Sequence, residues 1–219
     1  MYFEYGIREI DYLKSKDKIF AQAIDKIGKI DREIESDLFF SVVSSIVGQQ
    51  ISGKAQQTII KRILDFYGTI TAEKIAVSEL SELQSFGISY KKAEYIKDFA
   101  IKIVDGSFDI DSIRQMSDED AIKALSSLNG IGTWTAEMIL LFCLQRKNVF
   151  SFGDFGILRG LRMVYHHKKI DKKLFEKYRK RFSPYCSVAS LYLWEVASGA
   201  IEGMRDYAPV KKKIKMIYV

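Results

Sequence analysis

Residues 128–137 read Leu-Asn-Gly-Ile-Gly-Thr-Trp-Thr-Ala-Glu and lie between two stretches with helical apolar spacing. Gly130 and Gly132 let the backbone turn tightly and expose its N–H groups. The helix expected after Gly132 directs its positive end at the same place, so a phosphate group would fit there. Two glycines between helices are more often a simple turn, and the spacing alone leaves both interpretations open.

Helical spacing of apolar residues continues through most of the chain, whereas strand-like alternation is almost absent. Apolar residues make up 47% and charged residues 28% of the 219 residues, which is typical of a globular fold and argues against disorder. Because Pro184 and Pro209 are the only prolines, long helices meet few obligatory breaks. We therefore expect an all-α fold, with irregular structure in the first dozen residues.

The length suits one large domain or two small ones that share a cleft. We expect two helical subdomains flanking a cleft: residues 36–144, ending in the hairpin, and residues 1–35 together with 145–219. The expected helices cover residues 16–27, 37–47, 53–66, 78–84, 90–105, 118–125, 133–145, 155–165, 171–182 and 187–200.

The formal net charge of +6 fits a polyanionic partner without requiring one. Residues 158–182 carry ten Lys or Arg against Asp171 and Glu176. This stretch either faces phosphate groups or forms a solvated helix face, and the sequence leaves both open. Lys211, Lys212, Lys213 and Lys215 are read as a solvated terminus rather than a specific DNA contact.

Several classes of protein are excluded by what the chain carries. Its only cysteines, Cys143 and Cys186, with the adjacent His166 and His167, do not provide the ligands of a four-thiolate iron-sulfur cluster or a convincing zinc site. The sequence shows no signal-peptide pattern and no apolar run of 18 residues. We expect an intracellular, cytoplasmic protein with no membrane segment and no disulfide framework.

Beyond the hairpin, the loop Val-Phe-Ser-Phe-Gly-Asp-Phe at residues 149–155 is followed by Arg159. Together these segments resemble the helix-hairpin-helix (HhH-GPD) DNA glycosylases, which carry a glycine-, proline- and aspartate-rich loop after the hairpin. The resemblance implies that Asp154 is the catalytic residue. Two positions depart from the family pattern: Asn129 stands where proline is common, and Phe152-Gly153 replaces the usual proline near the aspartate.

At four further places the chain resembles the subfamily of 3-methyladenine DNA glycosylase II. They are Trp134, the segments 47–52 and 86–93, and Pro184-Tyr185 with Trp194 ten residues after the proline. The resemblance covers residues 36–200. Members that also cut the DNA strand carry lysine where this chain has Trp134, because a lysine amine forms a Schiff base with the sugar. The resemblance therefore implies a monofunctional glycosylase for alkylated purines, acting by base flipping in base excision repair.

The resemblance also assigns roles to individual residues. The base pocket would be lined by Trp134, Trp194, Tyr90, Phe152 and Tyr185. Duplex DNA would contact Gln49, Gln50, Ser52, Gly130, Gly132, Thr133 and Arg159. A monovalent cation would be held by the backbone carbonyls of Ser126, Leu128 and Ile131, and no other cofactor is expected. We expect a monomer whose partner is double-stranded DNA containing damaged bases.

Each of these assignments has a plainer alternative. Asp154 precedes an expected helix, where a carboxylate is a favourable N-cap. Trp134 and Trp194 lie on apolar helix faces, where tryptophan usually packs in the core. Gln50 stands where some relatives have a leucine that wedges the strands apart, but both it and Gln49 would also satisfy backbone groups at a helix end.

The chemistry explains why a carboxylate is sought. Breaking a glycosidic bond builds positive charge on the sugar, and a fixed carboxylate in a partly desolvated site stabilises that charge. An alkylated purine already carries positive charge and leaves readily, so a second acid is not obviously needed. The alternatives are a glycosylase for deaminated or oxidised bases and a non-catalytic helix-hairpin-helix DNA-binding protein.

Overall fold

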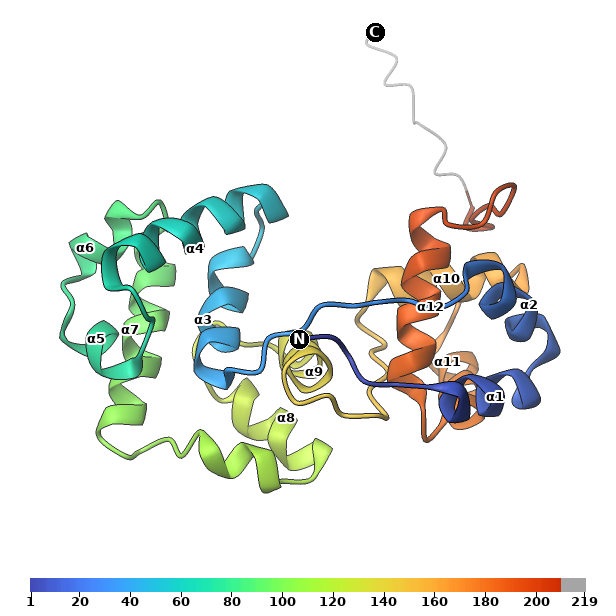
Figure 1. Ribbon diagram of the computed structural model, residues 1–219, viewed down its shortest axis with the longest axis horizontal. Helices are drawn as coiled ribbons and strands as arrows, with labels where there is room; N and C mark the ends of the chain where they lie inside the picture. Colours follow the sequence, from blue (N-terminus) through green and yellow to red (C-terminus); the bar gives the residue numbers. More distant parts are fainter. Residues whose placement is uncertain (210–219) are drawn as a thin grey trace, which may run out of the picture. The chain divides into compact units, whose positions relative to one another are not determined.

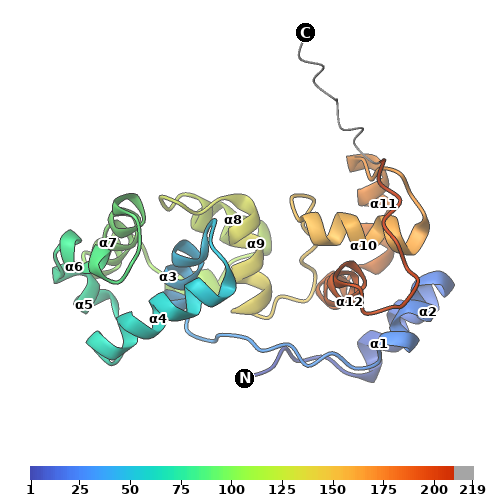
Figure 2. The same ribbon diagram turned by 90° about the horizontal axis from the view of Figure 1, so that it is seen from above.

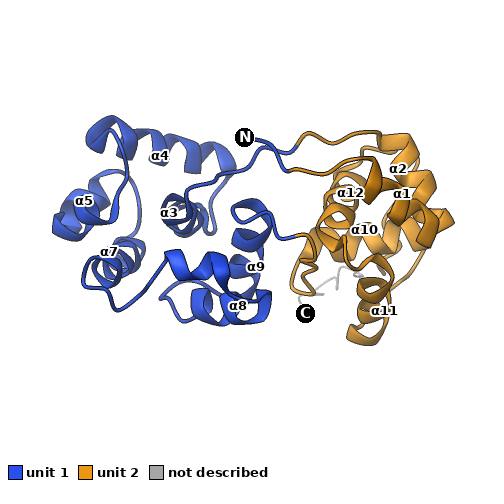
Figure 3. Ribbon diagram, turned by 60° about the horizontal axis from the view of Figure 1, so that its bottom comes forward, with its two compact units in different colours: residues 1–3, 32–146 blue, residues 4–31, 147–219 orange. Residues whose placement is uncertain are grey.

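The computed structural model describes residues 1–209 and divides the chain into two compact units (Figure 3). Unit 1 comprises residues 1–3 and 32–146, and unit 2 comprises residues 4–31 with the chain from Lys147 onward. Within the described residues the secondary structure is helical, apart from an isolated bridge between Tyr2 and Glu33. This confirms the predicted all-α class. The lysines of the C-terminal tail, Lys211, Lys212, Lys213 and Lys215, lie outside the described residues.

The helices of unit 1 pack around α3 and α7 (Figure 1). They are α3 (Leu38–Gly48), α4 (Gly53–Tyr67), α5 (Ala72–Val77), α6 (Leu80–Ser85), α7 (Tyr90–Val104), the 3-10 helix η1 (Asp111–Gln115), α8 (Asp118–Ser126) and α9 (Thr133–Phe142). The apolar face of α3 is fully buried through Val42, Val43 and Ile46. Helices α8 and α9 contact each other across the turn at residues 127–132, so the predicted helix-hairpin-helix is present.

Unit 2 contains α1 (Ile7–Lys16), α2 (Lys18–Ile27), α10 (Phe155–Tyr165), α11 (Lys172–Phe182) and α12 (Cys186–Ser198). Helices α10 and α12 lie side by side (Figure 2). Gly160 makes their close approach possible, because a Cβ added there would stand 2.4 Å from the Leu193 carbonyl oxygen. The middle of α10 therefore packs directly against α12 at Leu193.

Most helices begin where a short polar side chain can accept a hydrogen bond from a first-turn N–H group. Such N-caps contribute about 1 kcal/mol each. The capping side chains are Asp17, Asp37, Ser52, Thr71, Ser89, Ser117, Asp154 and Asp171. The helices expected at residues 37–47 and 118–125 begin close to these bounds, because the side-chain oxygens of Asp37 and Ser117 accept from Phe40 N and Asp120 N.

The structure corrects four expectations. Only residues 1–6 of the first dozen are irregular, because α1 begins at Ile7 after Gly6, whose N–H donates to the Glu9 carboxylate. The expected helix 16–27 is interrupted at Asp17, whose side chain caps α2. Helix α5 was not among the expected helices, because its six residues are too few to show an apolar period. Residues 1–3 and 32–35 belong to unit 1 because they bond to each other and to Phe142.

Among residues 1–209, no helix combines the length and the apolar character that crossing a membrane requires.

Candidate functional site

Asp154 stands at the start of α10 and is buried, with only 6% of the residue exposed. Its Oδ1 accepts a hydrogen bond from Ile157 N at 2.8 Å, so the N-cap expected from the sequence is present. The positive end of the helix dipole also stabilises a carboxylate at this position. Capping and a chemical role are compatible, because the cap fixes the direction of the carboxyl group.

The indole of Trp194 makes a second contact with the same oxygen. Trp194 lies on α12, and its Nε1–H donates to Asp154 Oδ1 at 2.9 Å. Gly156 leaves the space that the indole occupies: an added Cβ would stand 2.6 Å from Trp194 Cδ1 and 3.2 Å from Asp154 Oδ1. Donors from two helices therefore hold one carboxylate oxygen in place.

This arrangement fixes a negative charge in a partly desolvated position. Hydrogen bonds to an ionised carboxylate are about twice as strong as neutral ones, and they hold its orientation. A preorganised charge of this kind stabilises positive charge that develops next to it. The site is thus suited to a reaction that passes through a cation.

Two of the predicted pocket aromatics, Phe152 and Tyr185, lie in the same unit as Asp154 and Trp194. Phe152 precedes Asp154 in the loop and is 39% exposed, with its ring edge-on to Phe175 at 5.1 Å. Tyr185 is buried at the start of α12, edge-on to Tyr12 at 5.1 Å. The ring of Tyr185 thus contributes to packing between α1 and α12.

The other two predicted aromatics lie in unit 1. Trp134 is in the first turn of α9 and is 49% exposed. Tyr90 is the first residue of α7 and is 51% exposed. Both are large rings at the starts of helices and on the surface, which is unlike the core packing expected for tryptophan on an apolar face.

The hairpin presents backbone amides at the start of α9. Gly132 is the N-cap of α9, and within the described chain no side chain caps this helix. A Cβ added at Gly132 would meet no described atom within 4 Å, so there is open space on that side of the N-cap of α9. Gly130 has φ +83°, and a Cβ there would stand 2.4 Å from the Tyr95 ring. Gly130 is therefore required by the turn itself, and the start of α9 has no side-chain cap, which is the arrangement in which a helix N-terminus can accept an anion.

The segment after α3 is tied to this hairpin. Gln49 Nε2 donates to the Gly130 carbonyl oxygen at 2.6 Å. Lys92 Nζ donates to the carbonyl oxygens of Val47 and Gln49, at 2.8 and 2.7 Å, and burial lowers the pKa of this amine. Gln50 follows as an exposed residue with φ +57°, so the segment ends in a sharp turn.

Two of the residues predicted to contact DNA in this segment make hydrogen bonds within the protein. The amide of Gln49 satisfies a backbone carbonyl, but this carbonyl lies in the hairpin turn and not at a helix end. Ser52 caps α4 by accepting a bond from Ala55 N at 3.3 Å. Sequence reasoning missed Lys92, although it lies in the matched segment 86–93; only the folded structure shows that its amine reaches the end of α3.

The remaining predicted DNA residue, Arg159, lies on α10 and is 44% exposed at its side chain. Its Nε lies 3.9 Å from Asp206 Oδ2. Arg162, one turn further along, binds the same carboxylate through Nε and Nη2 at 2.7 and 2.6 Å. Arg162 is therefore structural, while Arg159 keeps an exposed guanidinium.

The chain matches a known protein family and several relatives. The HhH-GPD superfamily base excision DNA repair protein family matches residues 43–184. A DNA-3-methyladenine glycosylase of Saccharomyces cerevisiae is 30% identical over 77% of this chain and 69% of its own length. A putative DNA-3-methyladenine glycosylase of Bacillus subtilis is 29% identical over 74% of this chain, which spans 59% of that relative.

The fold of this chain is similar to that of a solved structure over almost its whole length. The DNA-3-methyladenine glycosidase of Bacillus halodurans superimposes with a TM-score of 0.83 at 32% identity, covering 94% of this chain and 97% of that one. The similarity therefore extends well beyond the hairpin and the loop at Asp154.

Proposed function

The chain belongs to the HhH-GPD superfamily of base excision DNA repair proteins, and from this premise we propose that it is a DNA glycosylase for alkylated purines of the 3-methyladenine type. The names of its relatives in Saccharomyces cerevisiae and Bacillus halodurans support this substrate class. The single observation that carries the proposal is the buried Asp154 carboxylate, held by Ile157 N–H and the Trp194 indole.

The reaction would break the bond between the purine nitrogen and the sugar C1′. The bonding electrons leave with the purine, so a cationic alkylated base departs as a neutral molecule and the sugar becomes cationic. Asp154 would stabilise that sugar cation, and water would then add to C1′ and lose a proton. The product is an abasic site with its phosphodiester bonds intact, because Trp134 provides no amine for a Schiff base.

Access to the base would require flipping it out of the duplex. We assign phosphate binding to the backbone amides of Gly130, Gly132 and Thr133, and to the exposed Arg159. Gln50, exposed at the sharp turn after α3, is our candidate for the residue that fills the vacated space. Ser52, two residues further along the chain, is a candidate contact to the DNA backbone. Gln49 would act indirectly by holding the hairpin.

Recognition of a cationic base would rely on aromatic rings. Cation-π attraction supplies about 0.5 to 2 kcal/mol per ring. The candidates in unit 2 are Trp194, Phe152 and Tyr185, and those in unit 1 are Trp134 and Tyr90. Of these, Trp194 has the firmest support because it contacts Asp154 directly.

A monovalent cation at the hairpin fits the donor chemistry of the residues present. Ser126 is the last residue of α8, and carbonyls at a helix C-terminus carry partial negative charge. The Leu128 carbonyl accepts Ile131 N–H at 3.1 Å, so it belongs to the hairpin turn itself. The carbonyls of Ser126, Leu128 and Ile131 would hold the ion, and its charge would strengthen phosphate binding.

The proposal is tested by base release from duplex oligonucleotides that carry one defined lesion. Asp154→Asn keeps the size of the side chain and an oxygen for the helix cap but removes the charge. We expect near-complete loss of free-base release with folding and affinity for undamaged duplex retained. Equal release by both proteins would refute the catalytic role.

The same assay separates the rival functions. A panel containing alkylated, deaminated and oxidised bases identifies the substrate class by which base is released. If wild-type protein binds every duplex and releases no base from any, the chain is a non-catalytic DNA-binding protein.

A further inference from the structure

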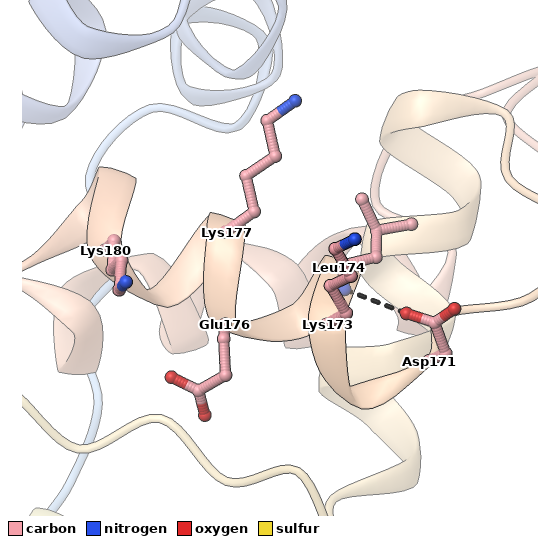
Figure 4. A pocket seen from close by; sticks show the side chains of 6 residues that line it. All are labelled: Asp171, Lys173, Leu174, Glu176, Lys177 and Lys180. Atoms are coloured by element: carbon pink, nitrogen blue, oxygen red, sulfur yellow. Dashed lines mark hydrogen bonds between the residues drawn. The ribbon is translucent and has the colours of Figure 1, made fainter.

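Helix α11 is the most basic element of the described chain, with six Lys or Arg among its eleven residues. Lys173, Lys177 and Lys180 are exposed and line a surface hollow of about 540 Å³ together with Asp171, Leu174 and Glu176 (Figure 4). We call Lys173, Lys177 and Lys180 the lysine row. In Figure 4, the side chain of Lys177 extends from the opposite side of α11 to that of Glu176.

The acidic groups near the lysine row are already engaged. The Asp171 carboxylate caps α11 by accepting Leu174 N–H at 2.8 Å. Glu176 pairs with Arg179 at 3.3 Å. Among the residues that the structure describes, none forms an ion pair with a member of the lysine row. Within residues 1–209, no ion pair therefore neutralises the positive charge of the row.

This arrangement is unfavourable for the helix itself. Lys173 lies in the first turn, where the helix dipole is already positive. Lys177 follows Lys173 by four residues and precedes Lys180 by three, so like charges are neighbours on the helix surface. A polyanion placed along the row would relieve both repulsions.

The spacing of the row fits a phosphate backbone. At a rise of about 1.5 Å per residue, Lys173 and Lys180 lie roughly 10 Å apart along the helix axis. One DNA strand carries a charge about every 3.4 Å along its axis, so the row spans roughly three phosphates. Lysine is suited to this task because it binds phosphate as a mobile point charge.

We propose that the lysine row of α11 is a second, sequence-independent contact surface for the phosphate backbone of duplex DNA, in addition to the hairpin. The inference rests on the proposed function in that it takes duplex DNA as the partner. It adds a surface of unit 2 to the hairpin amides of unit 1. The alternative is a helix face that is only solvated.

The test is the salt dependence of binding to an undamaged duplex, measured by fluorescence anisotropy over roughly 50 to 300 mM KCl. The slope of log K against log salt is negative, and each lost phosphate contact reduces its magnitude by about 0.9. For K173Q/K177Q/K180Q we therefore expect the magnitude of the slope to decrease by roughly 2 to 3. The matched control is K14Q/K29Q/K61Q, which removes the same charge from lysines that pair with Asp25, Asp31 and Asp65.

The control slope is expected to stay at the wild-type value. Equal slopes for the two triple variants would overturn the proposal and leave α11 as a solvated face. Thermal unfolding excludes a folding defect, because removing like charges from α11 should leave the unfolding temperature unchanged or raise it. K173R/K177R/K180R keeps the charge and should restore the wild-type slope, and failure of this rescue would also count against phosphate binding.

Failure of this inference is distinguishable from failure of the proposed function. Wild-type protein that releases alkylated bases but has the same slope as the lysine-row variant refutes the lysine row alone. If the wild-type protein releases no base, but the lysine-row variant has a smaller salt-dependence slope than the wild type, the glycosylase function is refuted. The proposal that the lysine row binds DNA then still stands.

Discussion

The Trp194 indole N–H donates to Asp154 Oδ1 at 2.9 Å, and Ile157 N–H donates to the same oxygen at 2.8 Å. One donor comes from α12 and the other from the first turn of α10, so the carboxylate orientation depends on how these two helices pack. Trp194 is therefore a positioning residue for Asp154, in addition to its proposed place in the base pocket.

The variant Trp194→Phe keeps an aromatic ring and removes the donor. A hydrogen bond to a charged group contributes about 1.5 to 3 kcal/mol, which corresponds to roughly 10- to 100-fold in rate. We expect single-turnover base release to fall by that factor while affinity for undamaged duplex is retained. Tyr192→Phe is the control, because it removes a hydrogen bond to Gly28 from the same helix without touching Asp154. Equal rates for the two variants would show that the indole bond does not position Asp154.

Gly156→Ala tests the space that the indole occupies. Alanine would normally favour a helix over glycine by roughly 1 kcal/mol. Here the added methyl group would stand 2.6 Å from Trp194 Cδ1, so we expect the indole to be displaced and base release to fall at least about tenfold. In the double variant with Trp194→Phe the two losses should not add, because both act on one contact. Additive losses in the base-release assay would mean that Gly156 acts elsewhere.

The contact between Asp154 and Trp194 could not be predicted from the sequence. Asp154 and Trp194 are each identified by the resemblance, but their hydrogen bond joins residues 40 positions apart. It depends on the approach of α10 to α12 at Gly160 and Leu193, which no local pattern encodes. Lys92 was missed for the same reason: its bonds to the end of α3 are tertiary contacts.

For the fold, the sequence was most informative where a cap precedes a long apolar period, as at α3, α8 and α10. It was least informative where the period is short, as in α5, or where a buried side chain interrupts a helical pattern. Asp17 does the latter, since its carboxylate caps α2 and also accepts the Tyr165 hydroxyl at 3.0 Å.

The Arg162–Asp206 pair makes folding stability depend on acid. The hydrogen bonds from Arg162 hold the pKa of Asp206 below its usual value of 3.8, although burial opposes this shift. A lowered folded-state pKa means that the stabilisation is present above the unfolded value, about pH 3.9, and is lost as the pH falls through the folded value. We expect Asp206→Asn to lower the free energy of unfolding by about 1 to 3 kcal/mol at pH 7.

Urea unfolding from pH 7 to about pH 2 measures this directly, and the difference between wild type and Asp206→Asn should shrink below about pH 4. Asp25→Asn is the control, because its partner Lys14 forms an exposed pair that contributes little at any pH. A difference that stays constant down to the lowest pH would show that the charge of Asp206 is not what stabilises the fold.

The absence of lysine at position 134 predicts which bonds in the DNA survive. With Trp134 at the start of α9, no amine is available there to attack the sugar, so product strands should stay intact until they are heated in alkali. Borohydride, which reduces a Schiff base to a stable bond, should trap no covalent adduct between wild-type protein and lesion-containing duplex. Trp134→Lys supplies the missing amine and should give a borohydride-dependent adduct on a denaturing gel, whereas Trp134→Phe should not. Efficient trapping by the wild-type protein would mean that another of its lysines reaches the sugar, and the enzyme would then cut the strand as well as release the base.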